Sequence, residues 1–240
     1  MAAEWISGGI GLTWGTDEEK LSSAEMVLLS AEKCVRQNDV DGLNGHVETL
    51  TQMGLNIVQL QTKWFLRAAY QGQVDLLVFC GKGLHKNGKP MPLLDAICDA
   101  ADGNRINAVK LLLKKLLRHE NIADVRDKLT FPFLRAASSR RISVAKHLHE
   151  ALRFDARVLN WAMATAASRG SLEAIHWLIL SGASDVVRAI SDARWAGHDE
   201  IAHQLEIWMQ KTKEAVSVDE QSTVVGGSIL ADEPRQISLT

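Results

Sequence analysis

The chain has 240 residues, of which 46% are apolar and 23% charged, with a formal net charge of −2, so it can bury a sizeable core. Its three cysteines are scattered without a Cys-x-x-Cys pair, which argues against a disulfide framework or a zinc ribbon. The chain start lacks the pattern of a secretory signal, and no apolar run approaches the ~20 residues of a membrane span. Few prolines and abundant alanine and leucine favour helices, so we expect an all-α, intracellular protein.

The first 20 residues contain a glycine-rich run and two tryptophans, Trp5 and Trp14. Exposing both indoles to water would be costly. We therefore expect residues 1–20 to form an extended leader that packs on the domain that follows. A helix around Ala24–Arg36 is expected to begin that domain and to cap it.

One pattern recurs along the chain: an alanine-rich helix, a tight turn and a second, apolar helix. Its clearest copy is SRGSLEAIHWLILSGAS, residues 168–184, where Gly170 separates the helices, Ser171 is placed to cap the second helix and Gly182 ends it. The equivalent turn positions are 27 to 36 residues apart and are Asn38, Gly72, Asn104, Arg140, Gly170 and Gly197. All but Arg140 are Gly or Asn, which tolerate positive φ, so we expect a distorted turn only at Arg140.

This pattern resembles that of the ankyrin-repeat family, whose period is ~33 residues. Met91–Ala96 and Phe131–Ala136 are similar to the family's opening motif Thr-Pro-Leu-His-x-Ala, Gly197-His198 to its Gly-His pair, and Leu172–Ile179 to its second helix. The resemblance covers residues 24–210 and implies a helical-repeat solenoid of about five to six degenerate repeats. Leucine replaces the motif's histidine in both opening copies, so we expect the repeats to rely more on apolar packing. A general helical-repeat solenoid is the alternative architecture.

The β-hairpin fingers that the family places between repeats are hard to find in this sequence. Only Gly81–Pro90 has the form of a full finger, with Asn87-Gly88 as a type I′ turn. We therefore expect at most one β-hairpin.

The repeat domain is expected to span residues 21–210, with a capping helix at His198–Met209. Residues 211–240 show no helical period, which predicts a flexible tail. Charge is uneven along the chain: residues 82–153 carry a net +8, and the segments on either side carry −5 each.

A search for catalytic motifs finds no phosphate-binding loop, nucleophile elbow or His-Glu-x-x-His sequence. The two histidine pairs, His147 with His149 and His198 with His203, lack the i, i+4 spacing that places two imidazoles on one metal ion. We expect no enzymatic activity, no cofactor and no metal.

The resemblance implies that a partner protein binds the concave side, which the first helices and finger tips form. Carried onto this sequence, the implied partner-binding residues are Arg67, Tyr70, Gln71, Arg135, Ser138, Thr165, Arg169 and Trp195. Tyr, Trp and Arg are the types enriched at binding hot spots. The expected finger adds three basic residues, Lys82, Lys86 and Lys89.

We therefore expect a monomeric, cytoplasmic protein-interaction module, with a nuclear location left open. Repeats this degenerate are similar to those of pathogen and viral effectors that mask or tether a host protein. The alternative is a nucleic-acid or anionic-ligand binder that uses the basic middle repeats. The lack of aromatic residues among those basic residues argues against nucleic acid.

Overall fold

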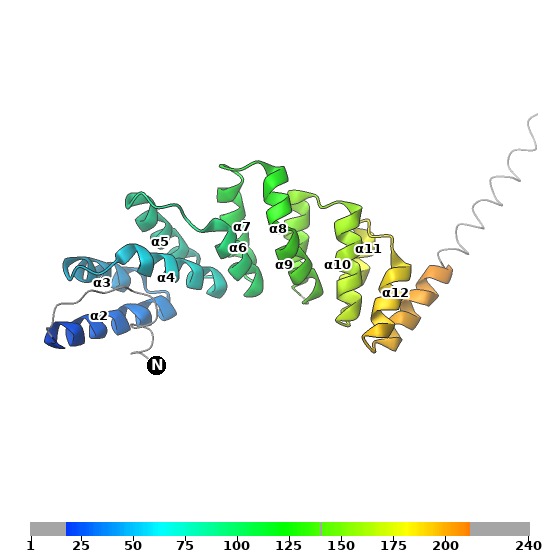
Figure 1. Ribbon diagram of the computed structural model, residues 1–240, viewed down its shortest axis with the longest axis horizontal. Coiled ribbons are helices and arrows are strands. Elements are labelled where there is room, and N and C mark those ends of the chain that lie inside the picture. The colour runs from blue at the N-terminus through cyan, green and yellow to red at the C-terminus, as the bar shows by residue number, and fades with distance from the viewer. Residues whose placement is uncertain (1–17, 140, 212–240) are drawn as a thin grey trace, which may run out of the picture. The chain divides into compact units, whose positions relative to one another are not determined.

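The computed structural model describes residues 18–139 and 141–211, and every regular element in these residues is helical (Figure 1). The described helices belong to two compact units, and the chain passes from the first to the second between Asn121 and Ile122. None of the described helices combines the length and the apolar character that crossing a membrane would require. Residues 1–17 of the expected leader lie outside the described residues, and the prediction of an extended leader is wrong for residues 18–20, which are helical. The expected tail lies outside the described residues from position 212 onward.

Unit 1 contains three helical hairpins, each made of a first helix and a second helix (Figure 1). The hairpins are α2 (Glu18–Gln37) with α3 (Val40–Gln52), α4 (Ile57–Gln71) with α5 (Val74–Lys86), and α6 (Leu93–Asp102) with α7 (Ile106–Leu116). The first helices α4 and α6 contact each other, and the second helices α3, α5 and α7 contact in sequence. The core of this unit includes Trp64 and Phe65, each 1% exposed.

Unit 2 repeats the arrangement, because α8 (Ile122–Ser138) pairs with α9 (Ile142–Leu152) and α10 (Ala156–Ser168) pairs with α11 (Leu172–Leu180). The first helix α12 (Val186–Trp195) is followed by a helical segment, 199–211, and Arg194 and Glu206 form an ion pair of 2.5 Å between them. Helix α10 contacts both α8 and α12, so the three first helices lie side by side.

The predicted turn positions are confirmed wherever the structure describes them. Asn38, Gly72, Asn104, Gly170 and Gly197 all have positive φ, between 56° and 80°, whereas Arg140 lies outside the described residues. The residue after each turn donates its N–H to a carbonyl five residues earlier, as Ser171 does to Ala166 at 3.0 Å. This Schellman motif recurs at all six turns, including Arg141 to Ala136. Repetition of one local motif makes the hairpins alike.

The predicted β-hairpin finger is wrong. Gly81–Lys86 belongs to α5, and Gly88, with φ 66°, ends that helix through bonds from Gly88 N to His85 O and Lys89 N to Leu84 O. An Asn-Gly pair suits a hairpin turn and a helix end equally, since both need positive φ. Burial of Cys80, Gly81 and Leu84 on one face of α5 decides between the two.

Two smaller predictions also need correction. Ser171 lies at the N-cap of α11, but its side chain makes no capping hydrogen bond and is 4% exposed. The motif copy Phe131–Ala136 does not begin a helix, since α8 begins at Ile122 and contains Pro132 in its interior. Proline removes one main-chain donor there, which the rest of this long helix tolerates.

Side chains that follow the turns connect successive hairpins of unit 1. Gln73 Nε2 donates to the carbonyl of Arg36 at 3.3 Å, and Arg105 Nε donates to the carbonyl of Tyr70 at 3.3 Å. Gln73 and Arg105 each follow a turn residue, and Arg36 and Tyr70 each lie two residues before the previous turn. The hairpins are therefore joined by polar bonds as well as by apolar packing.

Candidate functional site

Each first helix carries a stripe of side chains at positions 9, 5 and 2 before its turn residue. These positions are spaced four and three residues apart, so they lie on one helix face. In unit 2 the stripe, called here the first-helix stripe, consists of Phe131, Arg135 and Ser138; Trp161, Thr165 and Ser168; and Arg188, Asp192 and Trp195. Because α10 contacts α8 and α12, the three sets adjoin.

The first-helix stripe of unit 2 exposes aromatic side chains on each of its three helices. Phe131 is 67% exposed on α8, Trp161 is 50% exposed on α10 and Trp195 is 89% exposed on α12. Val187, next to the stripe on α12, is also 67% exposed. Solvent-exposed aromatic side chains that recur on neighbouring elements mark a surface suited to binding.

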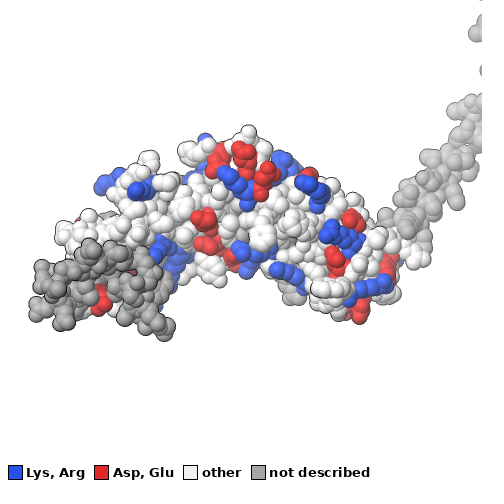
Figure 2. Space-filling model, in the orientation of Figure 1, with Lys and Arg blue, Asp and Glu red and all other residues white. Residues whose placement is uncertain are grey.

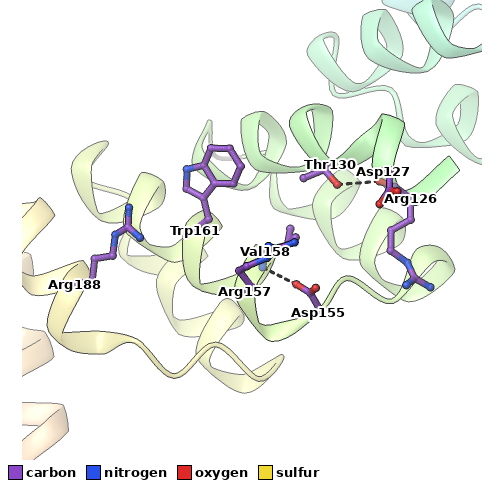
Figure 3. Close-up of a pocket in the computed structure, with 8 residues that line it drawn as sticks. All are labelled: Arg126, Asp127, Thr130, Asp155, Arg157, Val158, Trp161 and Arg188. Atoms are coloured by element: carbon purple, nitrogen blue, oxygen red, sulfur yellow. Dashed lines mark hydrogen bonds between the residues drawn. The ribbon is translucent and has the colours of Figure 1, made fainter. Parts of the chain in front are cut away.

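An open groove of about 570 Å³ adjoins Trp161 on the same helices (Figure 3). Its lining comes from the amino-terminal halves of α8, α10 and α12 and consists of Arg126, Asp127, Thr130, Asp155, Arg157, Val158, Trp161 and Arg188. The groove is therefore built from three first helices and contains one aromatic ring among charged groups.

Some charged side chains of the groove are engaged in hydrogen bonds or ion pairs, and one is not. Arg126 Nε donates to the carbonyl of Leu152 at 2.6 Å, and Asp155 caps α10 by accepting from Val158 N at 2.8 Å (Figure 3). Arg188 faces Asp192 at 3.8 Å on the same helix. Arg157 is exposed, and its side chain makes no hydrogen bond or ion pair with another described residue. Arg157 is thus the guanidinium most open to a ligand.

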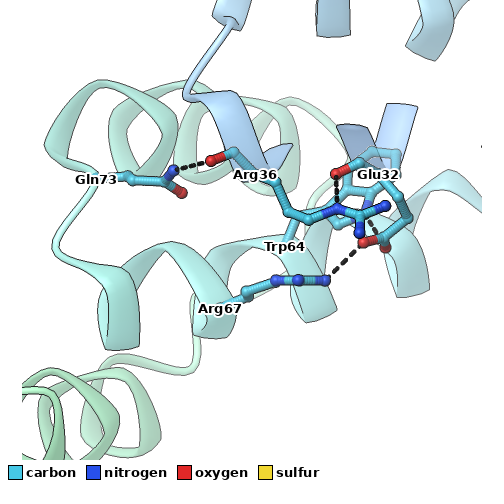
Figure 4. A network of polar contacts seen from close by, with 5 residues as sticks. All are labelled: Glu32, Arg36, Trp64, Arg67 and Gln73. Carbon is cyan, nitrogen blue, oxygen red and sulfur yellow. Dashed lines mark hydrogen bonds and ion pairs between the residues drawn. The ribbon is translucent and has the colours of Figure 1, made fainter. Parts of the chain in front are cut away.

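The structure distributes the predicted partner-binding residues over both units. Arg67, Tyr70 and Gln71 lie at the end of α4 in unit 1, where Tyr70 is 54% exposed. Arg67 Nη1 pairs with Glu32 Oε2 at 2.6 Å, and the same carboxylate accepts from Trp64 Nε1 at 3.0 Å (Figure 4). The Arg67 guanidinium is therefore already engaged within the unit.

The other predicted residues lie in unit 2. Arg169 is exposed and donates to Ser139 Oγ at 2.8 Å, Thr165 donates to the carbonyl of Trp161 at 2.8 Å, and Trp195 is the most exposed of the set. Arg135 is half-buried. Ser138 is 2% exposed and bonds to the carbonyl of Arg135, so its side chain does not reach the surface.

Sequence reasoning missed Phe131 and Trp161. The resemblance to ankyrin repeats implied binding residues mainly in the last turn of each first helix. Helix α8 has 17 residues and α10 has 13, so the first-helix stripe extends further toward their amino ends. The signal was present: Trp161, Thr165 and Ser168 are spaced as one helix face. The basic residues assigned to a finger lie instead on α5, at Lys82 and Lys86, and just after it, at Lys89.

Titratable groups with altered pKa lie away from the groove among the described residues. Burial raises the pKa of the Cys80 thiol to about 12 and, together with the nearby Asp39 carboxylate, raises that of Cys34. Burial also lowers the pKa of His149. Within residues 18–139 and 141–211 no three His, Cys, Asp or Glu side chains are placed to share a metal ion.

No protein-family model matches this chain, and no curated protein matches it in sequence.

Proposed function

We propose that this protein is a non-enzymatic interaction module, an ankyrin-like helical solenoid that binds another protein through the first-helix stripe of unit 2. The observation that carries the proposal is the exposure of Phe131, Trp161 and Trp195 on three adjoining first helices. The resemblance to ankyrin repeats agrees with this use of first helices.

A partner bound on the first-helix stripe would remove apolar surface of these three aromatic rings from water. A large aromatic side chain buries 150–250 Å² when fully enclosed, so covering roughly 100 Å² on each ring contributes about 2.5 kcal/mol per residue. Aromatic residues also lose little conformational entropy when they become ordered, and they are enriched among hot spots. Three such residues together would contribute about 7–8 kcal/mol before the entropy cost of association is subtracted.

The groove beside Trp161 supplies polar specificity around this apolar surface. Arg157 and Arg188 border the ring from α10 and α12. Guanidinium groups at the rim of an apolar patch favour a partner that brings carboxylates to them. The proposed partner surface is therefore apolar at its centre and acidic at its edge.

The test is affinity capture from a cell extract with the full chain as bait. The wild type is compared with Trp161→Ala/Trp195→Ala and with a matched control, Leu180→Ala/Ile207→Ala. The control removes two exposed apolar side chains of unit 2, 88% and 42% exposed, that lie on second helices. We expect a protein that the wild type and the control both retain, and that the tryptophan variant loses.

Direct titration of the captured protein then measures the loss. We expect the tryptophan variant to bind about 30-fold more weakly and to remain folded, with a melting temperature lowered by several degrees because Trp161 is half-buried. Equal binding by the two double variants would remove the first-helix stripe as the binding surface.

A further inference from the structure

A group of cations lies on the second helices α5 and α7 of unit 1 and just after their carboxyl ends, away from the first helices. We call Lys82, Lys86, Lys89, Lys110, Lys114 and Arg118 the second-helix basic face. All six side chains are exposed, and none of these side chains forms a hydrogen bond or ion pair with another described residue. Figure 2 shows blue atoms without red neighbours at the upper end of α5, where this face begins.

The repeat places these cations side by side. Lys82 lies ten residues after the turn at Gly72, and Lys114 lies ten residues after the turn at Asn104; Lys86 and Arg118 each lie fourteen residues after theirs. Helices α5 and α7 contact each other, so equivalent positions form two adjoining columns. A Cβ atom on Gly81 would lie 3.7 Å from Lys115 Nζ, so the side chain of Lys115 on α7 reaches α5 at this end.

Few acidic groups lie near this charge: α5 and α7 together carry one carboxylate, and Glu120 lies just after Arg118. Asp75, in the first turn of α5, is the one carboxylate on α5 and α7, whereas the three aspartates of α6 lie on a first helix. The basic face does not continue onto α3. Glu48 lies there ten residues after the turn at Asn38, the position that Lys82 holds on α5. Lysines in a last helical turn stabilise the helix dipole, but Lys82 and Lys110 lie before that turn.

The side chains of the second-helix basic face indicate which class of ligand it can bind. None of the exposed large apolar side chains lies on α5 or α7, so the face lacks the apolar anchor that protein interfaces and membrane-inserted amphipathic helices use. Binding of a phosphodiester backbone needs only cations, because release of condensed counterions drives it. Stacking aromatics are required by single strands and not by a duplex, whose bases are already stacked.

We propose that the second-helix basic face binds duplex nucleic acid through its phosphate backbone, without sequence preference. This binding uses unit 1 and is independent of the protein binding proposed for unit 2. Lysine is suited to the role because it acts as a flexible point charge and does not require a fixed bidentate geometry.

The test is fluorescence anisotropy with the full chain and a labelled 30-base-pair DNA duplex of mixed sequence, over a series of salt concentrations. With up to six phosphate contacts, the slope of log K against log salt is expected to approach about −5. Two duplexes of different sequence should bind equally.

The decisive variant is Lys82→Gln/Lys86→Gln/Lys114→Gln. Loss of three contacts should make the slope shallower by about 3 and weaken binding roughly 100- to 500-fold at 0.1 M salt. The matched control, Lys33→Gln/Lys146→Gln/Lys211→Gln, changes net charge equally at three exposed lysines outside the face and should bind like the wild type. Circular dichroism and melting temperature should be the same for all three proteins.

Several outcomes would overturn the proposal. They are absence of duplex binding by the wild type at 0.05 M salt, a flat salt dependence, and an equal loss in both triple variants. Tighter binding to vesicles containing phosphatidylserine than to the duplex would assign the face to a membrane instead. None of these results would alter the capture experiment, since that experiment concerns residues of unit 2.

Discussion

The main chain of Gly103 lies against the carbonyl oxygen of Tyr70, so closely that a Cβ atom on residue 103 would be 2.0 Å from that oxygen. The same oxygen accepts from Arg105 Nε at 3.3 Å. Gly103 caps α6 and Tyr70 lies in the last turn of α4, so this contact fixes how the second and third hairpins of unit 1 meet. The φ angle of Gly103 is −74°, which any residue can adopt, so the glycine is required by space alone.

Gly103→Ala should therefore destabilise the protein by about 2–3 kcal/mol, because a backbone carbonyl cannot move aside as a side chain can. Gly45→Ala is the matched control, since nothing lies within 4 Å of a Cβ atom there and the residue is inside α3. The control should be neutral or stabilise by about 0.5–1 kcal/mol. Urea unfolding measures both, and similar values for the two variants would contradict the packing argument.

Substitutions at Gly197 measure the energetic cost of the left-handed turn conformation without a steric clash. Its φ is 80° and no atom lies within 4 Å of a Cβ position. Gly197→Ala should cost about 1–2 kcal/mol from left-handed strain alone. Gly197→Asn should cost clearly less, because Asn38 and Asn104 hold the equivalent turns at φ 58° and 56°. If thermal or urea unfolding finds the alanine and asparagine variants equal, the turns are not interchangeable.

The Glu32 carboxylate joins α2 to α4 by accepting from both Trp64 and Arg67 (Figure 4). Trp64 is 1% exposed, so Glu32→Ala leaves a buried indole N–H without its acceptor and should cost about 1–3 kcal/mol. Glu32→Gln keeps an acceptor for that N–H and should cost less.

A double-mutant cycle of Glu32→Ala with Arg67→Ala isolates the ion pair. We expect a coupling energy of about 1 kcal/mol or less, because the two side chains are 26% and 35% exposed and solvent screens them. The coupling should shrink in 1 M salt. A coupling that does not respond to salt would indicate a packing contact and not an ion pair.

His149 makes the stability of unit 2 depend on pH. Burial and the nearby Arg153 cation lower its pKa below the ordinary value of 6.5, against the opposing effect of Glu150. Its ring lies among Phe133, Phe154 and Trp177, with centroid separations of 6.2 to 6.4 Å. The folded protein therefore favours the neutral imidazole.

At pH values between the lowered pKa of folded His149 and 6.5, the unfolded chain binds more protons at this residue than the folded protein does. The contribution of His149 to stability is complete above pH 6.5 and is lost as the pH falls through the folded-state pKa. Urea unfolding from pH 7.5 down to pH 5 should show this decline, and His149→Phe should flatten it. A pH profile that the substitution leaves unchanged would assign the decline to other groups.

The local parts of the fold could be predicted from the sequence. Turn positions at Asn38, Gly72, Asn104, Gly170 and Gly197 followed from residue types that tolerate positive φ, set between runs of helical period. The end of α11 at Gly182 followed in the same way, and its φ is 108°. These features depend on a few consecutive residues, so the sequence is a sufficient guide to them.

The candidate site was only partly predictable. Trp195 and Arg169 were named from the sequence and are exposed, but Ser138 is buried and Arg67 is paired with Glu32. Phe131 and Trp161 were missed because the start of α8 and α10 depends on how far each helix packs against its neighbours. Exposure is a property of neighbours that are distant in sequence, which a local pattern does not contain.

The sequence by itself determined a series of paired helices and the left-handed residues that separate them, because φ preference and apolar periodicity act over one or two helical turns. The tertiary structure alone decided that Asn87-Gly88 ends a helix, since burial of Leu84 against neighbouring helices outweighs the local preference for a hairpin. It also decided that the Tyr70 carbonyl meets Gly103 and Arg105, and that aromatic rings lie on one surface of unit 2. These outcomes depend on contacts between residues about 30 apart, which form only when hairpins stack.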